Sequence, residues 1–412
     1  MRAGFAQRDI TPNRSMGMAG FDRRKDPSTG TLDPLDVCAL AFEDTHGARF
    51  VMCVFDLLGT DSTLCVRIKE AVSKALEIEP VQVWVGATHT HSAPTGHFAG
   101  GQTYDETYVS FLTAQAVSAA QAAMADLREV TPAGALTYAS GVASLRNRGR
   151  EGSQFPMSLP LIFLEGREQP LVLARISCHP TVLDERNLLY SRDLPGQLRD
   201  GLMPEHRCLV LNGACADLST RFTRTASDPA QLRYLGAKLT DAARNAQPEA
   251  APQFGEVIRC AEQVVYLSRS ASLSGQLRES ILTALRQKVA TCTDPQALRE
   301  YDSRIAVLER TAVGAEKNRM IRIGAVNFGS CIFVGVPFEV DYADGVDLEQ
   351  TLTSVAGKPV HLVCYSFGYD GYLPSGAPLS AESSYEDIAS RYLPESRAQV
   401  WESAKQCVMD VM

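Results

Sequence analysis

The sequence lacks the features that define several large classes of protein. None of its apolar runs reaches the ~18–20 residues that a membrane-spanning helix needs. Basic residues are not in excess, since the net charge is −8, which argues against general binding to nucleic acid or anionic membranes. The amino-terminal segment has no apolar signal core, so we expect a cytoplasmic protein.

Closely spaced cysteine pairs are also missing. The chain has 11 cysteines, but none of them forms a Cys-x-x-Cys pair. Most, such as Cys53, Cys178, Cys208 and Cys331, stand singly inside apolar segments. This pattern is typical neither of a disulfide framework nor of a structural zinc site, so we expect reduced cysteines in the core of a cytosolic protein.

Apolar, β-branched segments instead alternate with amphipathic segments along the 412 residues. This alternation predicts an α/β fold. A charged stretch at about 270–311 has helical spacing and predicts a helical insertion. Because the sequence has no repeats, low-complexity tract or linker, we expect one domain over residues 1–412.

Polar residues that can bind metals or transfer protons follow five of the expected strands. In α/β folds the ligand crevice lies where strands end and loops begin, so these residues are expected to converge on one site. They are His89 and His91, then His179, then Asp217 and Ser219, then Glu339, and finally Tyr369 and Tyr372.

The types of residue in this set favour a metal site. Two imidazoles and a carboxylate are a recurrent catalytic zinc environment, and wide sequence separation suits a catalytic rather than a structural zinc. Each residue has a simpler explanation on its own: a histidine can be a hydrogen-bonded structural ring, Glu339 can cap a helix, and Ser219 can end a turn. The repeated pattern of apolar run, small residues and reactive side chain therefore carries the prediction of a metallohydrolase.

At these positions the sequence resembles the neutral ceramidase family of zinc-dependent amidases. The similar segments follow the family's order over most of the chain, and the His-Thr-His-Ser-x-Pro element is specific. The resemblance implies a catalytic domain of neutral ceramidase type, with a mixed β-sheet and the metal site at strand ends. The segments are "AGFAQRDITP", "LDPLDVCALAFED", "DLLGT", "ATHTHSAP", "LRNRG", "SCHPTVL", "NGACADLST", "GVPFEV", "GYDGYLP" and "SSYE".

The resemblance also implies which residues hold the metal. His89 and His179 would bind zinc through imidazole nitrogens, Glu339 would supply the carboxylate, and Tyr372 would complete the coordination sphere. Tyr369 is the alternative ligand, since it lies three residues away, and is otherwise a substrate-binding residue.

Other residues are expected around the metal on the same grounds. His91 would line the site without binding zinc and polarise the scissile carbonyl. Arg148 would be an active-site arginine, and Tyr385 a second tyrosine at the cleft. Ser219 would act as nucleophile or as an orienting hydroxyl, of which we favour orientation, and Asp217 would contact the substrate.

The sequence departs from the family in ways that bear on the substrate. It stops soon after the tyrosine segments, so we expect no C-terminal immunoglobulin-like domain. The serine element "CADLST" lacks the family's Gly before Asp and its Pro after Ser. The charged segment 184–206 looks unsuited to a long acyl chain. We therefore predict a zinc-dependent hydrolase that uses metal-activated water to cleave the amide bond of a small or polar N-acyl substrate.

Three alternatives stay open at this point. The same centre could serve an ester or lactone hydrolase, or an acyl-transferring biosynthetic enzyme. A true lipid ceramidase would need an apolar groove beside the metal. A non-catalytic binding protein would have no use for the complete ligand set. The oligomeric state is open between a monomer and a homo-oligomer.

Overall fold

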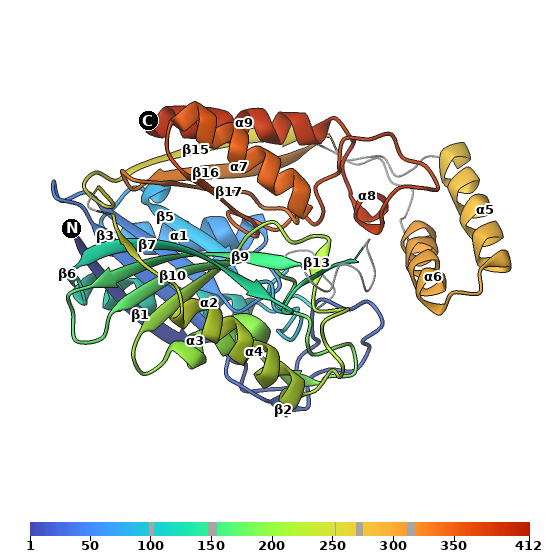
Figure 1. Ribbon diagram of the computed structural model, residues 1–412, viewed down its shortest axis with the longest axis horizontal. Helices are drawn as coiled ribbons and strands as arrows, with labels where there is room; N and C mark the ends of the chain where they lie inside the picture. The colour runs from blue at the N-terminus through green and yellow to red at the C-terminus, as the bar shows by residue number, and fades with distance from the viewer. Residues whose placement is uncertain (99–102, 147–154, 252, 269–274, 311–317) are drawn as a thin grey trace.

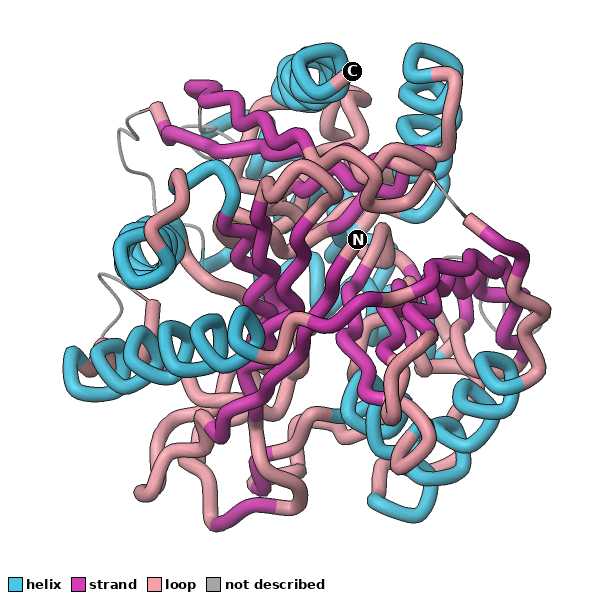
Figure 2. Tube along the Cα trace, turned by 90° about the vertical axis from the view of Figure 1, so that its left-hand side faces the viewer, coloured by secondary structure: helices cyan, strands magenta, loops and turns pink. Residues whose placement is uncertain are grey.

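Three mixed β-sheets, with helices packed around them, make up most of the chain (Figure 1). Figure 2 shows the strands running through the middle of the molecule, with most of the helices around them. The computed structural model describes residues 1–98, 103–146, 155–251, 253–268, 275–310 and 318–412. Arg148 lies outside these described residues.

The first sheet has the strand order β5-β4-β3-β1-β6. Helix α2 (Glu106–Ala125) begins after Asp105, whose carboxylate accepts hydrogen bonds from the backbone of Thr107 and Tyr108, and the helix packs on this sheet together with α1 (Ser62–Leu76). Both helices agree with the amphipathic pattern of the sequence. The strands are β1 (Arg2–Asp9), β3 (Asp36–Glu43), β4 (Arg49–Phe55), β5 (Val83–Ala87) and β6 (Arg128–Glu129), with a 3-10 turn η1 (Pro80–Gln82) before β5.

The second sheet has the order β12-β10-β9-β7-β14. Its helices are α3 (Asp193–Leu202), which packs on β12, and α4 (Pro229–Arg244), which packs on β7. The strands are β7 (Thr131–Ser140), β9 (Pro156–Glu165), β10 (Leu171–Ile176), β12 (Arg207–Asn212) and β14 (Glu249–Ala250).

The third sheet has the order β15-β16-β17-β18. Helices α7 (Tyr342–Ala356) and α9 (Ser396–Val411) pack on it. The strands are β15 (Arg259–Leu267), β16 (Arg319–Asn327), β17 (Ile332–Gly335) and β18 (Val360–Val363). Two short pairs complete the strands, β2 (Gly30–Thr31) with β11 (Leu189–Tyr190) and β8 (Ser144–Leu145) with β13 (Leu218–Ser219).

Helices α5 (Gly275–Thr291) and α6 (Pro295–Arg310) occupy the stretch expected to be a helical insertion. They lie to one side of the sheets, next to the short helix α8 (Tyr385–Ala389) (Figure 1). Their apolar faces form a small core of their own, in which Leu285 and Leu308 meet Ile388 of α8. The insertion is thereby attached to the segment that carries Tyr385.

Each sheet contains one pair of parallel neighbours, and a helix joins the two strands of every pair. The pairs are β4–β5 joined through α1, β10–β12 through α3, and β17–β18 through α7. The segments that follow the carboxyl ends of β5, β10, β12, β17 and β18 hold the candidate residues. This is the geometry that brings distant parts of an α/β chain into one crevice.

Much of the charged segment 184–206 is buried and does not line the cavity of the candidate site. Arg192 and Arg199 of this segment are buried and form ion pairs with Asp36, and Arg199 also pairs with the fully buried Asp56. A buried carboxylate needs a partner of opposite charge, and these arginines supply it from α3 and the residue before it. Only the first residues of the segment, 184–186, line the cavity described below.

The cysteines behave as expected from their positions. All 11 are unpaired, and nine are buried. Among the helices that the structure describes, none combines the length and apolar character required to cross a bilayer.

Candidate metal centre

His89 stands just beyond β5 in a strained backbone conformation. Its φ is +69°, in the left-handed region that costs a non-glycine residue on the order of 1–3 kcal/mol. The surrounding structure holds it there, because its amide donates to Leu57 O at 3.0 Å and its ring stacks on Tyr365 at 3.9 Å between centroids. Its Nδ1 lies 2.7 Å from Leu58 O.

His179 is held in the same manner at the end of β10. Its amide donates to Leu218 O at 3.0 Å, and its Nδ1 lies 2.6 Å from Cys215 O. A carbonyl oxygen can only accept, so Nδ1 carries the proton in both histidines, and in the neutral rings Nε2 keeps its lone pair. This orientation is the usual one for histidines that bind a metal through Nε2.

Glu339 meets both of these nitrogens. Its Oε2 lies 2.9 Å from Nε2 of His179 and 3.4 Å from Nε2 of His89. Its Oε1 accepts a hydrogen bond from the Tyr369 hydroxyl at 2.7 Å. The backbone reinforces the contact, because Glu339 N donates to Gly371 O and Glu339 O accepts from Leu373 N, which fixes Tyr372 beside the glutamate.

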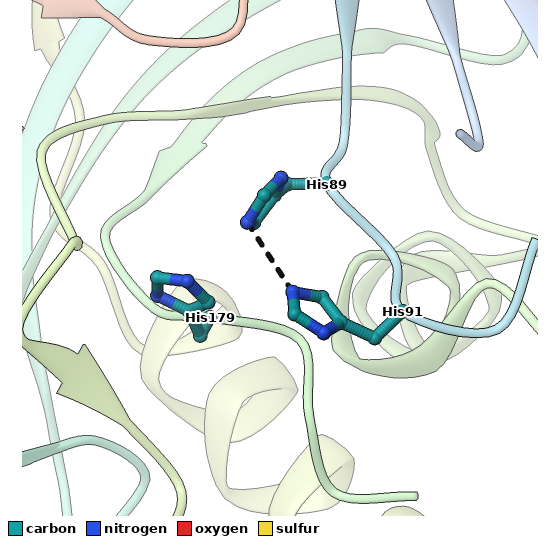
Figure 3. A group of neighbouring side chains, drawn as sticks. All are labelled: His89, His91 and His179. Carbon is teal, nitrogen blue, oxygen red and sulfur yellow. Dashed lines mark hydrogen bonds between the residues drawn. The ribbon is translucent and has the colours of Figure 1, made fainter. Parts of the chain in front are cut away.

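The donor set therefore suits a metal ion. Two imidazole lone pairs face a carboxylate oxygen, an arrangement that a bound cation would stabilise. The imidazole nitrogens of His89, His91 and His179 also gather within 4.8 Å of one another, and the three rings point towards a common centre (Figure 3). Imidazole with carboxylate is the ligand chemistry of a catalytic zinc site. Among the described residues this is the cluster whose composition fits such an ion.

His91 occupies the cavity side of the cluster. Its Nε2 lies 3.3 Å from Nε2 of His89, while its buried Nδ1 has no hydrogen-bond partner among the described residues. Burial lowers the pKa of His91 well below its usual value, and the other two histidines lower it further. Burial likewise lowers the pKa of His179 to about 4.

The backbone of Gly20 packs directly against the His91 ring. Gly20 has a φ of +98°, and a Cβ at this position would lie 2.5 Å from the ring atoms of His91. Phe21 holds the same ring from the side, in an edge contact of 4.9 Å between centroids. The glycine is therefore required both for its backbone conformation and for close approach to His91.

Gly20→Ala is expected to disturb catalysis as well as stability. The backbone strain should cost about 1–3 kcal/mol, and displacement of His91 should lower turnover by about 10-fold to 10²-fold while zinc stays bound. Gly47→Ala is the matched control, because Gly47 has a φ of +87° with no atom near its missing Cβ. Urea unfolding and kcat of both variants separate the two effects. Equal turnover in the two variants would argue against a catalytic position for His91.

Two charged residues at the site escaped the sequence analysis. Arg146 is hydrogen-bonded to Tyr372 and lies 3.4 Å from Glu386. Arg146 belongs to the same "RNRG" segment as Arg148, so the motif pointed to the right place in the chain. Glu386 follows Tyr385 directly, and burial raises its pKa above the usual value. Both side chains line the cavity in front of the metal ligands.

The two tyrosines offered as ligands have different surroundings. The Tyr369 hydroxyl donates a hydrogen bond to Glu339, whereas Tyr372 lines the cavity and is hydrogen-bonded to Arg146. Tyr385 packs edge-on against Tyr372, with 5.9 Å between ring centroids. Burial raises the pKa of Tyr385 to about 12, so its hydroxyl keeps its proton at neutral pH.

Ser219 and Asp217 line the cavity beside His179. Ser219 forms a bridge with His179 along the backbone, and its Oγ accepts a hydrogen bond from Arg221 N at 3.3 Å. Asp217 Oδ1 accepts from Tyr342 N at 2.8 Å, which ties the serine loop to the start of α7. Ser219 thus lies beside His179, a candidate metal ligand. Among the described residues, no general base is hydrogen-bonded to the Ser219 hydroxyl group.

The cavity itself is large, with a volume of about 1260 Å³, and many charged residues line it. His91, His179 and Tyr372 lie in its wall, and α6 closes the opposite side. Most of the remaining lining residues are arginines and carboxylates, and Phe21 and Ala306 are apolar residues among them. Charged groups in the wall favour a ligand that can hydrogen-bond to them.

The fold and site together define an α/β protein with a buried histidine–glutamate cluster, which could hold a metal ion, at the ends of its parallel strands. No protein-family model matches the sequence, and no curated protein matches it either. Solved structures do match over the whole chain. A structure described as ceramidase complexed with C2 has a TM-score of 0.76 at 16% identity. The match covers 100% of this chain and 74% of the chain in that structure.

Neutral ceramidase from Pseudomonas aeruginosa gives the same result. Its TM-score is 0.76 at 18% identity, and the match covers 99% of this chain and 74% of that chain. The chain therefore has the neutral ceramidase fold, which confirms the fold expected from the sequence motifs.

Proposed function

We propose that this protein is a zinc-dependent amidohydrolase that cleaves the N-acyl bond of a small or polar substrate. The main support is the contact of two imidazole nitrogens with one carboxylate oxygen beside a cavity lined by charged residues. Oε2 of Glu339 lies 3.4 Å from Nε2 of His89 and 2.9 Å from Nε2 of His179. Both solved neighbours are described as ceramidases, which favours hydrolysis of an amide. Eleven unpaired cysteines are consistent with the expected cytoplasmic location.

Zinc would be held by His89, His179, Glu339 and a tyrosine, for which Tyr372 is our choice because it faces the cavity. When bound, it would lower the pKa of a coordinated water towards ~7 and supply a nucleophilic hydroxide at neutral pH. Tyr369 then acts on the carboxylate, keeping Glu339 oriented through its hydroxyl.

The cavity residues would serve the substrate. His91, whose Nε2 lies 3.3 Å from Nε2 of His89, would donate to the carbonyl oxygen as negative charge develops there. Arg146 would add positive charge beside Tyr372. Arg148, which lies outside the described residues, stays a proposed active-site arginine. Tyr385 would pass its proton to the leaving amine. Ser219 would orient the substrate, a role that its hydrogen bond from Arg221 N supports more than nucleophilic attack.

The substrate follows from the cavity wall. Charged side chains would have to lose water to accommodate a long hydrocarbon chain, whereas polar substrates can hydrogen-bond to them. We therefore infer a short or polar N-acyl compound, with a lipid ceramide as the alternative.

A substrate panel tests this assignment. The zinc-loaded protein is expected to hydrolyse short N-acyl compounds with kcat/KM at least about tenfold above that for long-chain ceramide. Unfavourable contacts that together cost about 1.4 kcal/mol are enough for a tenfold difference. Chelation of the metal should abolish the activity and zinc should restore it. Efficient cleavage of ceramide without turnover of short amides would reverse the substrate assignment, and esters in the same panel would reveal an esterase.

A further inference from the structure

A side hollow of about 510 Å³ opens next to the metal cavity, between the loop after β13 and the start of α6. Five charged residues line both the hollow and the main cavity, so the two spaces are continuous. Four of these residues are arginines: Arg186, Arg221, Arg224 and Arg299. The fifth is Asp184, which is the carboxylate that the hollow presents among the described residues.

Asp184 is already neutralised within the protein. Arg186 holds it in a bidentate pair, with Nη2 2.6 Å from Oδ2 and Nε 3.2 Å from Oδ1. Although burial acts to raise the pKa of Asp184, the hydrogen bonds from Arg186 lower it below the usual value, so the carboxylate is ionised and occupied. Its charge also acts on Arg224, but among the described residues it forms an ion pair with Arg186 and with none of the other three arginines.

Those three arginines have no carboxylate partner among the described residues. Arg224 donates to the backbone oxygens of Thr181 and Val182, and the Arg221 guanidinium lies over the Phe222 ring at 5.6 Å. Arg299 makes no side-chain ion pair in the part of the chain that the structure describes. The nearby Glu300 forms an ion pair with Arg304 on the same helix and not with Arg299.

The arginines also act on one another. Burial lowers the pKa of Arg221, and the positive charges of Arg146, Arg299 and Arg224 lower it further despite the opposing effect of Glu300. Burial lowers the pKa of Arg224 as well, although the charges of Asp184, Asp193 and Glu185 act to raise it. In a protein of net charge −8, a cluster of mutually repelling cations is not a general surface property. An anion in the hollow would relieve this repulsion, and the first turn of α6 at Pro295 adds the partial positive charge of a helix start.

We propose that this hollow binds an anionic group of the substrate, a carboxylate or a phosphate, while the amide bond of the same molecule lies at the metal centre. The inference rests on the proposed amidase function and extends it to N-acyl compounds with an acidic end. Guanidinium groups match carboxylate and phosphate oxygens in paired hydrogen bonds, so the cluster supplies both charge and orientation. The continuous cavity allows one molecule to reach both places.

Binding of inorganic phosphate tests the hollow without reference to turnover. The full-length zinc-loaded protein is titrated by calorimetry, together with the double variant Arg221→Gln/Arg299→Gln. Each lost charged contact should weaken binding about tenfold, so the pair should lose up to about 10²-fold in Kd. Arg23→Gln is the matched control, because Arg23 is exposed like Arg221 and Arg299 but lines only the main cavity, and it should change Kd by less than about twofold. Equal phosphate affinity in the double variant and the wild type would overturn the proposal.

Kinetics then identify the anion. The wild type should prefer an N-acyl amino acid or an N-acyl phosphoethanolamine over an uncharged N-acyl amine of equal length, and the relative kcat/KM of the two acids distinguishes carboxylate from phosphate. The double variant should lose this preference mainly through KM and still cleave the uncharged amide. Equal rates for acidic and uncharged substrates would refute the anion site and leave the amidase intact. Phosphate binding at the arginines without turnover of any amide would refute the amidase and leave the anion site.

Discussion

Replacing His89 or His179 by alanine is expected to empty the metal site and abolish turnover together. Each ring presents Nε2 to the same carboxylate oxygen of Glu339, and each is fixed through Nδ1 by a backbone carbonyl. A catalytic zinc site has three protein ligands or a few more, so removal of one imidazole leaves too few to hold the ion. Zinc content should fall from about one per chain to near zero in either variant.

The measurement is metal analysis of the purified variants, together with kcat on the best N-acyl substrate. His206→Ala is the matched control, because His206 lies at the far end of α3, 3.9 Å from Glu165 and away from the cluster, and it should keep both zinc and activity. Retention of full zinc occupancy by both the His89 and the His179 variants would sink the ligand assignment. Circular dichroism should show that the variants are folded, which excludes loss of metal through unfolding.

His91→Ala is expected to keep zinc and lose turnover. Its ring lies on the cavity side of the cluster, and its Nε2, which lies near Nε2 of His89, would donate to a substrate oxygen. Such a donor acts chiefly in the transition state, so the loss should appear in kcat and amount to about 10²–10³-fold. His89, His179, Glu339 and a tyrosine would still hold the metal.

The three histidines are close enough for His91 to be a ligand instead, since their imidazole nitrogens lie within 4.8 Å. Metal analysis of the His91 variant decides between the two roles. Loss of zinc as complete as in the His89 variant would make His91 a ligand and end this division of labour. A variant with lower thermal stability but unchanged kcat per folded molecule would reduce His91 to a packing residue.

The sequence predicted where reactive side chains occur because strand ends are marked locally. Apolar runs followed by small residues located the segments of His89, His179 and Glu339, and the structure brings all three together. The long helix α2 and the helical stretch at α5 and α6 were equally evident, because helical periodicity and capping residues lie within a few residues of one another.

Properties that depend on contacts between distant segments were not predictable. Nothing in the sequence indicated partners for the charges of Arg192 and Arg199, which pair with buried aspartates more than a hundred residues away. Arg146 gained its place beside Tyr372 only through folding, although its neighbour Arg148 had been singled out. Sequence spacing alone also left Tyr369 and Tyr372 equivalent, whereas the structure gives Tyr369 to Glu339 and leaves Tyr372 facing the cavity.

By itself, the sequence determined the class of fold and the chemical types of the metal-site residues, because periodicity and strand-end composition are local properties. Only the tertiary structure decided what surrounds that site. The charged wall and the gathering of Arg221, Arg224 and Arg299, which form no ion pair with a carboxylate among the described residues, result from the approach of α6 and the β13 loop to one another. The charge balance in a cavity depends on distances in space between charged residues, and these distances cannot be read from their separation along the chain.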